Sequence, residues 1–144
     1  MEQLNDVIFY SLDKAIRTYR QFAQKELKKA GFTITIDQWL IIKTILENPD
    51  ISQQDLGELV FKDNASVTRI IEILVQSELL IRNVSDVDRR RTNLRVTKKG
   101  KKVIEDVQKV VLVNRAVALK NISKDMINTV NKSLQQIIKN CSDE

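Results

Sequence analysis

The sequence lacks histidine and has little cysteine, proline, glycine or aromatic content. Its 144 residues include one Cys, one Pro and three Gly, and Phe, Trp and Tyr together make up 5%. The absence of histidine excludes acid–base and nucleophilic mechanisms that depend on an imidazole. Three glycines are too few for a glycine-rich phosphate loop, and the lone Cys141 excludes an internal disulfide. An enzyme is therefore poorly supported.

The sequence also offers few ligands for a metal ion. A site built from Cys and His is excluded because the chain has one Cys and no His. A site made only of carboxylates is not excluded, but no cluster of Asp and Glu suggests one. We therefore expect neither a metal nor another cofactor.

Long hydrophobic runs are missing as well. No stretch approaches the ~18 consecutive apolar residues that a membrane-spanning helix needs. The start, MEQLNDV, lacks the basic-then-apolar pattern of a signal peptide. At 42% hydrophobic and 30% charged, the chain can bury a core and is not disordered. Together with the single cysteine, these features predict a cytoplasmic protein without membrane contact, built as one domain or as a domain with helical extensions.

A long helix is predicted at the start of the chain. Apolar residues recur at intervals of three and four from Leu4 to about Ala30, and Gly31 follows as a stop signal. Such a helix can pack against a second copy of the chain or wrap its own core.

A second helix is predicted from near Thr35, because Thr35 and Gln38 have the spacing of a capping box. Its apolar face includes Trp39, and a turn cluster at 48–50 ends it. A lone Trp on such a face is more often part of the core than a residue that stacks on a ligand.

Residues 51–76 have the pattern of a helix-turn-helix. Ser52 and Asp55 form a capping pair that opens a short helix, with its apolar side chains turned inward, and Asp63 or Asn64 then caps a further helix. The inward residues of the first helix are Leu56, Leu59 and Val60. One face of the second helix carries Val67, Ile70, Ile71 and Leu74, and the opposite face carries Ala65, Arg69, Glu72 and Gln76.

A β-hairpin is predicted next. Residues 79–84 and Thr92–Val96 read as two strands that pair through a turn containing Arg89, Arg90 and Arg91, and Thr97 caps the helix that follows. From Arg82 to Lys102 the chain has nine basic and two acidic residues, a net charge of +7, whereas the whole chain carries +5. The rest of the chain is therefore at −2, and the basic charge is concentrated in one place, as expected of a protein that binds a polyanion.

Two helices are predicted at the end of the chain. The first carries valines at nearly heptad spacing, and a break at 121–124 separates it from a last helix with Ser123 as its cap. The valines are Val103, Val107, Val110, Val113 and Val117. Cys141 lies on the apolar stripe of the last helix, so a small buried thiol or one at a frayed helix end is favoured over a redox sensor.

The order helix, turn, helix, basic hairpin predicts a winged helix-turn-helix, in a mainly α fold with a small β-hairpin. This fold places the second helix of the motif in the major groove of DNA. Three alternatives remain open: a solvated charge run on an ordinary helical hairpin, a helical dimer whose basic hairpin binds an acidic partner protein, and an RNA-binding protein. RNA recognition usually employs exposed aromatic residues, and 82–102 contains none.

The sequence resembles the MarR family of bacterial transcriptional regulators. The resemblance rests on DNASVTRIIEIL, followed by LLIRNVSDVDRRRTNLRVTKKG. The family's Asp-x-Arg motif in the wing corresponds to Asp88-Arg89-Arg90, and the motif that ends its second strand corresponds to 96–100. The resemblance covers nearly the whole chain. It implies a winged lobe at 35–100 and a dimerisation region formed by 1–34 and 101–144.

The resemblance also implies a function and a set of site residues. The function is a homodimer that binds double-stranded DNA at a pseudo-palindromic operator and acts as a ligand-responsive repressor. The DNA-binding residues implied are Asn64, Ser66, Thr68, Arg69, Arg89, Arg90 and Arg91. Asp88 is expected to position the wing arginines, because a carboxylate near phosphates would repel them.

Two further expectations come from the family. Its members commonly respond to small aromatic or phenolic effectors, and the aromatic residues nearest the expected cleft include Tyr19, Phe22 and Trp39. In addition, the family usually has Gly just before the apolar pair that opens the first wing strand, where this chain has Glu78. If the backbone there is left-handed, Glu costs about 1 kcal/mol relative to Gly.

Overall fold

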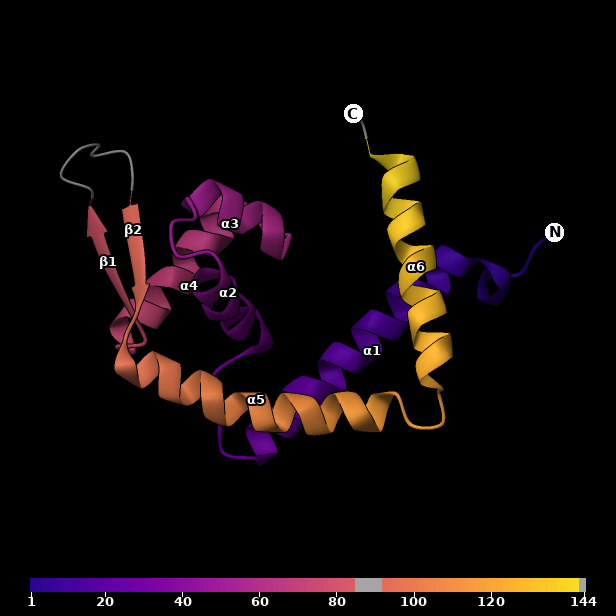
Figure 1. The fold of residues 1–144 in the computed structure, drawn as a ribbon, viewed down its shortest axis with the longest axis horizontal. Coiled ribbons are helices and arrows are strands. Elements are labelled where there is room, and N and C mark those ends of the chain that lie inside the picture. The colour runs from indigo at the N-terminus through magenta and orange to yellow at the C-terminus, as the bar shows by residue number, and fades with distance from the viewer. Residues whose placement is uncertain (85–91, 143–144) are drawn as a thin grey trace. The chain divides into compact units, whose positions relative to one another are not determined.

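The computed structural model describes residues 1–84 and 92–142 (Figure 1). Two compact units make up the chain, Met1–Asn114 and Arg115–Glu144. The prediction of a mainly α fold with a small hairpin is confirmed. The elements are a 3₁₀ helix η1 (Leu4–Asp6), α1 (Ile8–Lys29), α2 (Ile36–Glu47), α3 (Gln53–Val60), α4 (Asn64–Gln76), β1 (Leu80–Val84), β2 (Thr92–Val96), α5 (Lys98–Ala118) and α6 (Lys124–Cys141).

The first helix begins later than predicted. The chain forms η1 at Leu4–Asp6, becomes extended at Val7, and starts α1 at Ile8. Asn and Asp favour turns over helices, and the β-branched Val7 favours the extended backbone found there. The predicted end is confirmed, because Gly31 has φ +90° and the N–H of Phe32 bonds back to the carbonyl of Leu27.

The second helix begins as predicted. The Thr35 hydroxyl accepts a hydrogen bond from the Gln38 N–H, and the Gln38 side chain accepts one from the Thr35 N–H, so both halves of the capping box form. The inner face of α2 is the centre of the core, with Ile41, Ile42 and Ile45 buried.

One inward residue of the short helix α3 was predicted wrongly. Leu56 and Val60 are buried, but Leu59 is 55% exposed, and Gly57 takes the third buried position. At about 100° per residue, Leu56, Val60 and Gly57 lie within one arc and Leu59 falls outside it. Gly57 fits this face because a Cβ there would lie 2.9 Å from the carbonyl oxygen of Lys62, so the turn can pass close to the helix.

The core of the first unit joins the helices to the hairpin. Its fully buried members include Leu27 of α1, Val67 and Ile71 of α4, and Val107 of α5. The second half of α1 therefore packs in the core of the lobe. The stretch from Met1 to Ile16 exposes several large apolar side chains.

The hairpin pairs as predicted. β1 and β2 are antiparallel, with Leu80 opposite Val96 and Arg82 opposite Leu94. Leu80, Leu94 and Val96 are buried, whereas Asn93 and Arg95 on the other face are exposed. The predicted turn at 85–91 lies outside the described residues.

The base of the hairpin is a tightly bonded corner. Glu78 has φ +62°, so the condition for a backbone cost at this position is met. The N–H of Thr97 donates to the Leu79 carbonyl at 3.1 Å, and its hydroxyl donates to the Glu78 carbonyl at 2.7 Å. The same hydroxyl accepts from the N–H of Gly100 at 2.9 Å, which confirms Thr97 as the cap of α5.

In the second unit, Ser123 caps α6 as predicted, accepting from the N–H of Met126 at 3.1 Å. No residue of α6 is buried, and its apolar side chains are half-buried or exposed. Cys141, the last residue of the helix, is a free exposed thiol, so the prediction of a buried thiol is wrong. Among the described residues, no helix has the length and apolarity to cross a membrane.

Candidate nucleic-acid interface

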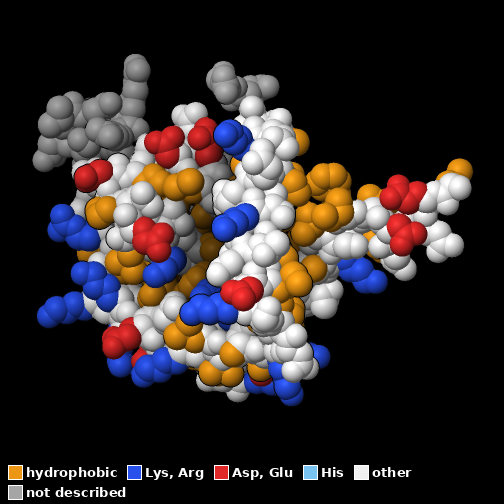
Figure 2. Space-filling model, turned by 45° about the vertical axis from the view of Figure 1, so that its right-hand side comes forward, with side chains coloured by type: hydrophobic (Ala, Val, Ile, Leu, Met, Phe, Trp, Pro, Cys, Tyr) orange, Lys and Arg blue, Asp and Glu red, His pale blue; other side chains and the backbone are white. Residues whose placement is uncertain are grey.

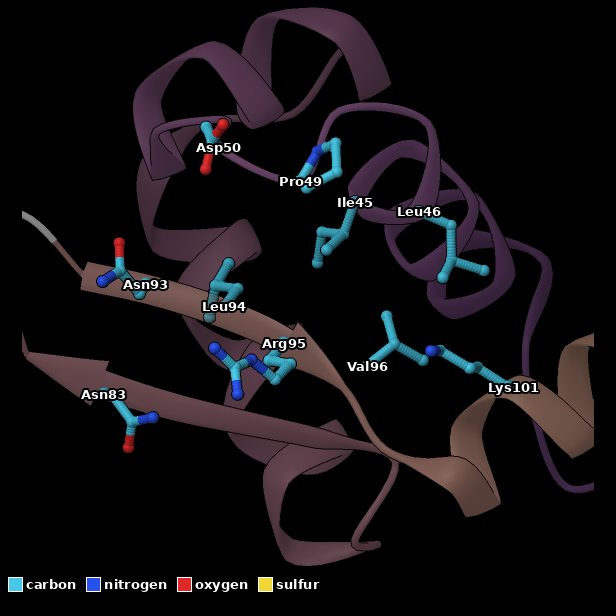
Figure 3. A pocket seen from close by; sticks show the side chains of 10 residues that line it. All are labelled: Ile45, Leu46, Pro49, Asp50, Asn83, Asn93, Leu94, Arg95, Val96 and Lys101. Carbon is cyan, nitrogen blue, oxygen red and sulfur yellow. The ribbon is translucent and has the colours of Figure 1, made fainter.

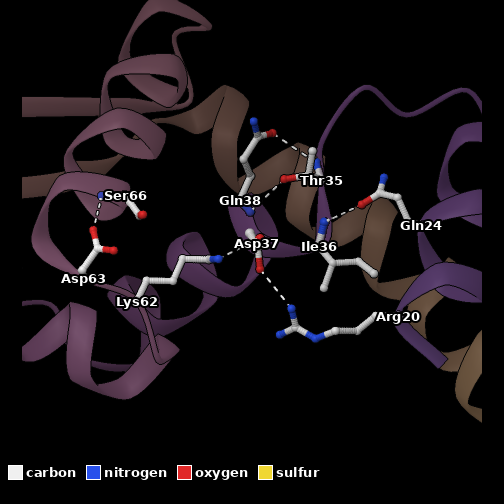
Figure 4. Close-up of polar contacts among 9 residues, drawn as sticks. All are labelled: Arg20, Gln24, Thr35, Ile36, Asp37, Gln38, Lys62, Asp63 and Ser66. Carbon is white, nitrogen blue, oxygen red and sulfur yellow. Dashed lines mark hydrogen bonds and ion pairs between the residues drawn. The ribbon is translucent and has the colours of Figure 1, made fainter. Parts of the chain in front are cut away.

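The helix-turn-helix is formed by α3, the turn at Phe61–Asp63 and α4. Of the two predicted caps, Asp63 is the one used: its carboxylate accepts from the Ser66 N–H at 2.8 Å (Figure 4). This backbone hydrogen bond, with a further one from the Ser66 side chain, lowers the pKa of Asp63 below its ordinary value. The carboxylate thus stays ionised at the positive end of the helix.

Four predicted DNA-contacting residues lie together on the first two turns of α4. Asn64 and Arg69 are exposed, and Ser66 and Thr68 are half-buried. The hydroxyl of Thr68 donates to the carbonyl of Asn64 at 2.8 Å. The arrangement presents an amide and a guanidinium at the exposed start of a helix, the part that meets base edges in docked helix-turn-helix proteins.

Gln53, the first residue of α3, was missed by the sequence analysis. Its side-chain nitrogen donates to Asn64 Oδ1 at 3.0 Å and to Thr68 Oγ1 at 2.7 Å. The contacts span 11 and 15 residues along the chain, and no short-range pattern marks them. Gln53 therefore joins the first helix of the motif to the residues exposed on the second.

The arginines of the wing are only partly described. Arg89, Arg90 and Arg91 lie outside the described residues, as does Asp88. Arg95 is exposed on the outer face of the hairpin. Arg82, which was counted with the basic segment, is half-buried and opposite Leu94, on the face that carries Leu80.

Basic side chains continue past the hairpin into α5. They are the exposed side chains of Lys98, Lys99, Lys101 and Lys102. On the face of the molecule drawn in Figure 2, Lys and Arg side chains lie among Asp and Glu side chains. Lys99 also donates to the Ser77 carbonyl at 3.2 Å, which ties the start of α5 to the end of α4.

A carboxylate bridge links α1, α2 and the turn of the motif. Asp37, in the first turn of α2, lies 3.2 Å from Arg20 Nη1 and 3.1 Å from Lys62 Nζ (Figure 4). On the same side, Gln24 of α1 accepts from the Ile36 N–H at 3.0 Å. Because Lys62 directly precedes the cap Asp63, the bridge helps to hold the start of α4 against α1.

The predicted effector residues are half-buried. Tyr19 and Phe22 lie on α1, and Trp39 packs against the core from α2. Trp39 Nε1 is buried and has no hydrogen-bond partner among the described residues.

A separate pocket of about 440 Å³ opens between the end of α2, the hairpin and the start of α5 (Figure 3). Its lining mixes apolar residues such as Ile45 and Val96 with polar ones such as Asn93, and includes none of Tyr19, Phe22 and Trp39. In the described part of the chain, no three acidic or sulfur-bearing side chains lie close enough to hold a metal ion.

Comparison with known proteins matches the part of the chain that carries α2, the helix-turn-helix and the first hairpin strand. The model of the MarR family matches residues 34–92. The HTH-type transcriptional regulator MhqR of Bacillus subtilis (strain 168) is 29% identical over 100 residues, which cover 69% of this chain and 68% of MhqR.

Solved structures agree over the whole chain. A MarR-family transcriptional regulator from Rhodococcus sp. RHA1 superposes with a TM-score of 0.84 at 17% identity, covering 95% of this chain and 96% of the other. CouR from Rhodococcus jostii RHA1 superposes over the full length of both chains, with a TM-score of 0.82 at 18% identity. These likenesses confirm the winged helix-turn-helix fold. Residues 34–92 thus match the MarR family, and the similar proteins named here are described as transcriptional regulators.

Proposed function

We propose that the protein regulates transcription as a homodimer that binds double-stranded DNA and represses from a pseudo-palindromic operator. The observation that carries the proposal is the exposed start of α4, with Asn64 and Arg69, in the same unit as the basic hairpin and the basic start of α5. Two copies of α4 related by a dimer axis call for half-sites about one helical turn apart, roughly 10 base pairs. The wing arginines 89–91 would add contacts to the DNA backbone or minor groove, with Asp88 positioning them.

Selection of bound sequences from a random duplex pool tests DNA binding. We expect a motif with dyad symmetry. Arg69→Ala should relax the preference at one position of each half-site, because a bidentate contact to guanine discriminates by about 1–3 kcal/mol. Arg17→Ala is a matched control, since Arg17 is exposed on α1 and its ion pair among the described residues is with Asp13 four residues away. A motif without dyad symmetry would contradict the proposed docking, and uniform weakening of all sequences by Arg69→Ala would contradict base readout.

Exposed apolar side chains support the homodimer. In the first unit, Leu4, Ile8, Phe9 and Ile16 are each more than half exposed, and in the second unit Val117, Met126 and Ile138 are as well. Surfaces of this kind mark protein contacts. Sedimentation equilibrium should give a dimer at micromolar concentration, and Met126→Asp should shift it toward monomer. Asn131→Asp, on the same helix at an exposed polar position, should not. A monomeric wild type would refute the proposal.

A small aromatic or phenolic effector is proposed for the region of Tyr19, Phe22 and Trp39. Two facts support it: the indole N–H of Trp39 is buried without a partner among the described residues, and the related CouR is bound to p-coumaroyl-CoA in its solved structure. An effector that lowers operator affinity must bind the operator complex more weakly by the same factor. Titrating salicylate-like compounds into that complex tests this. Unchanged operator affinity would remove the proposal and leave DNA binding intact.

A further inference from the structure

The contacts of Gln53 fix the direction of hydrogen bonding at the start of α4. Its Nε2 has two hydrogens, and each has an acceptor: Asn64 Oδ1 at 3.0 Å and Thr68 Oγ1 at 2.7 Å. The single hydrogen of the Thr68 hydroxyl goes to the Asn64 carbonyl. These three bonds leave neither the Gln53 amide nitrogen nor the Thr68 hydroxyl with a hydrogen to donate to DNA.

The orientation of the Asn64 amide follows from these contacts. With Oδ1 held toward α3 by Gln53, the two N–H groups of Nδ2 are directed away from that contact. Asn64 is exposed, so these donors are available to a ligand. In the major groove, guanine presents two acceptors and thymine presents one, adenine presents an acceptor beside a donor, and cytosine presents a donor. An asparagine held in this way favours a base with acceptors.

We propose that Gln53 is a positioning residue that determines sequence specificity, by making Asn64 a hydrogen-bond donor toward the operator. The inference rests on the proposed DNA-binding function. It predicts guanine or thymine at the base that faces Asn64. It also predicts that Thr68 contributes no hydroxyl donor to base readout, so Thr68→Val should select the same motif as the wild type.

Gln53→Glu tests the proposal by reversing the direction of the hydrogen bond between residue 53 and Asn64. A carboxylate at this position can only accept, so a hydrogen bond between residue 53 and Asn64 then requires Asn64 to turn its Nδ2 toward α3 and its Oδ1 outward. Random-pool selection with Asn64→Ala first identifies the operator position that Asn64 faces, as the position that becomes degenerate. At that position Gln53→Glu should change the preference from guanine or thymine to cytosine or adenine, by about tenfold, within the range for one base contact.

Gln54→Glu is the matched control, because it adds the same charge at the next residue, whose side chain makes no hydrogen bond to α4 among the described residues. It should weaken all sequences equally and keep the wild-type motif. Gln53→Met, which lacks both donor and acceptor, should leave the position degenerate and serves as the second variant if Gln53→Glu fails to fold by circular dichroism.

The outcomes separate the two proposals. If the wild type enriches no motif, the proposed DNA-binding function fails, and the role of Gln53 fails with it. If the wild type enriches a motif and both Gln53 variants retain it, DNA binding stands and the role of Gln53 is overturned. A wild-type preference for cytosine at the position of Asn64 would also overturn it.

Discussion

At the scale of single residues, Glu78 is one of the non-glycine residues with a left-handed backbone among those described, together with Phe61 and Asn121. It occupies the left-handed region at φ +62°, where a side chain costs about 1 kcal/mol relative to Gly. Its ion pair with Lys99, at 3.9 Å and with both side chains more than half exposed, offsets little of this cost. We expect Glu78→Gly to raise the free energy of unfolding by about 1 kcal/mol, measured by urea denaturation. Asn121→Gly, at φ +67°, should gain less, because Asn tolerates this conformation. A loss of stability in Glu78→Gly would contradict the argument.

Ionisation of Asp63 makes the stability of the helix-turn-helix depend on pH in the acidic range. Its pKa in the folded protein is lowered from 3.8, chiefly by the hydrogen bond from the Ser66 N–H. The carboxylate therefore stabilises the fold fully above 3.8, and the contribution is lost as the pH falls through the lower pKa of the folded state. Asp63→Asn retains a cap that cannot ionise. Thermal melts between pH 5 and 2 should show a smaller acid-induced loss for Asp63→Asn than for the wild type, and equal losses would contradict the assignment.

At the scale of elements, the corner between α4, the hairpin and α5 depends on Gly100. A Cβ on Gly100 would collide with the Leu79 carbonyl oxygen and lie 2.8 Å from Val96 Cγ1. The carbonyl is held by its hydrogen bond from Thr97, so it cannot move away freely. Gly100→Ala should destabilise the protein by about 1–3 kcal/mol, the usual cost of overpacking. At Gly31, by contrast, a Cβ meets nothing within 4 Å, so Gly31→Ala should cost only the backbone strain of φ +90°. Calorimetry on the two variants would compare these costs, and an unchanged stability of Gly100→Ala would refute the close approach.

Local features of the helices and of the hairpin could be predicted from the sequence, whereas contacts between elements could not. The caps at Thr35, Ser52 and Ser123 were predicted correctly because each bonds to a backbone N–H three residues ahead. The hairpin was predicted because alternation and register are local properties of its strands. Leu59 was placed wrongly because eight residues define the buried arc of a helix poorly. Gln53 was missed because its partners come from another helix, and only tertiary structure brings them within reach.

At the scale of the whole molecule, the absence of histidine predicts how DNA binding responds to conditions. No side chain has an ordinary pKa between 5 and 8, so the net charge changes little around neutrality. We expect operator affinity to vary less than about twofold between pH 6 and 8. The logarithm of operator affinity should instead fall linearly with the logarithm of salt concentration, with a slope proportional to the number of phosphate contacts. Fluorescence anisotropy titrations of operator binding at varied pH and at varied salt concentration measure both effects. A strong pH dependence near neutrality would contradict the prediction, because it would require an ionisation that the described part of the chain does not indicate.

The bonds made by Thr97 have a consequence for how the molecule opens. Its backbone and hydroxyl connect the turn between α4 and β1 to the end of the second hairpin strand and the first turn of α5, so these segments cannot separate without breaking its hydrogen bonds. The amide hydrogens of Thr97 and Gly100 should therefore exchange with heavy water through one shared opening event rather than two. By the same connection, a tilt of α5 would carry the base of the hairpin with it.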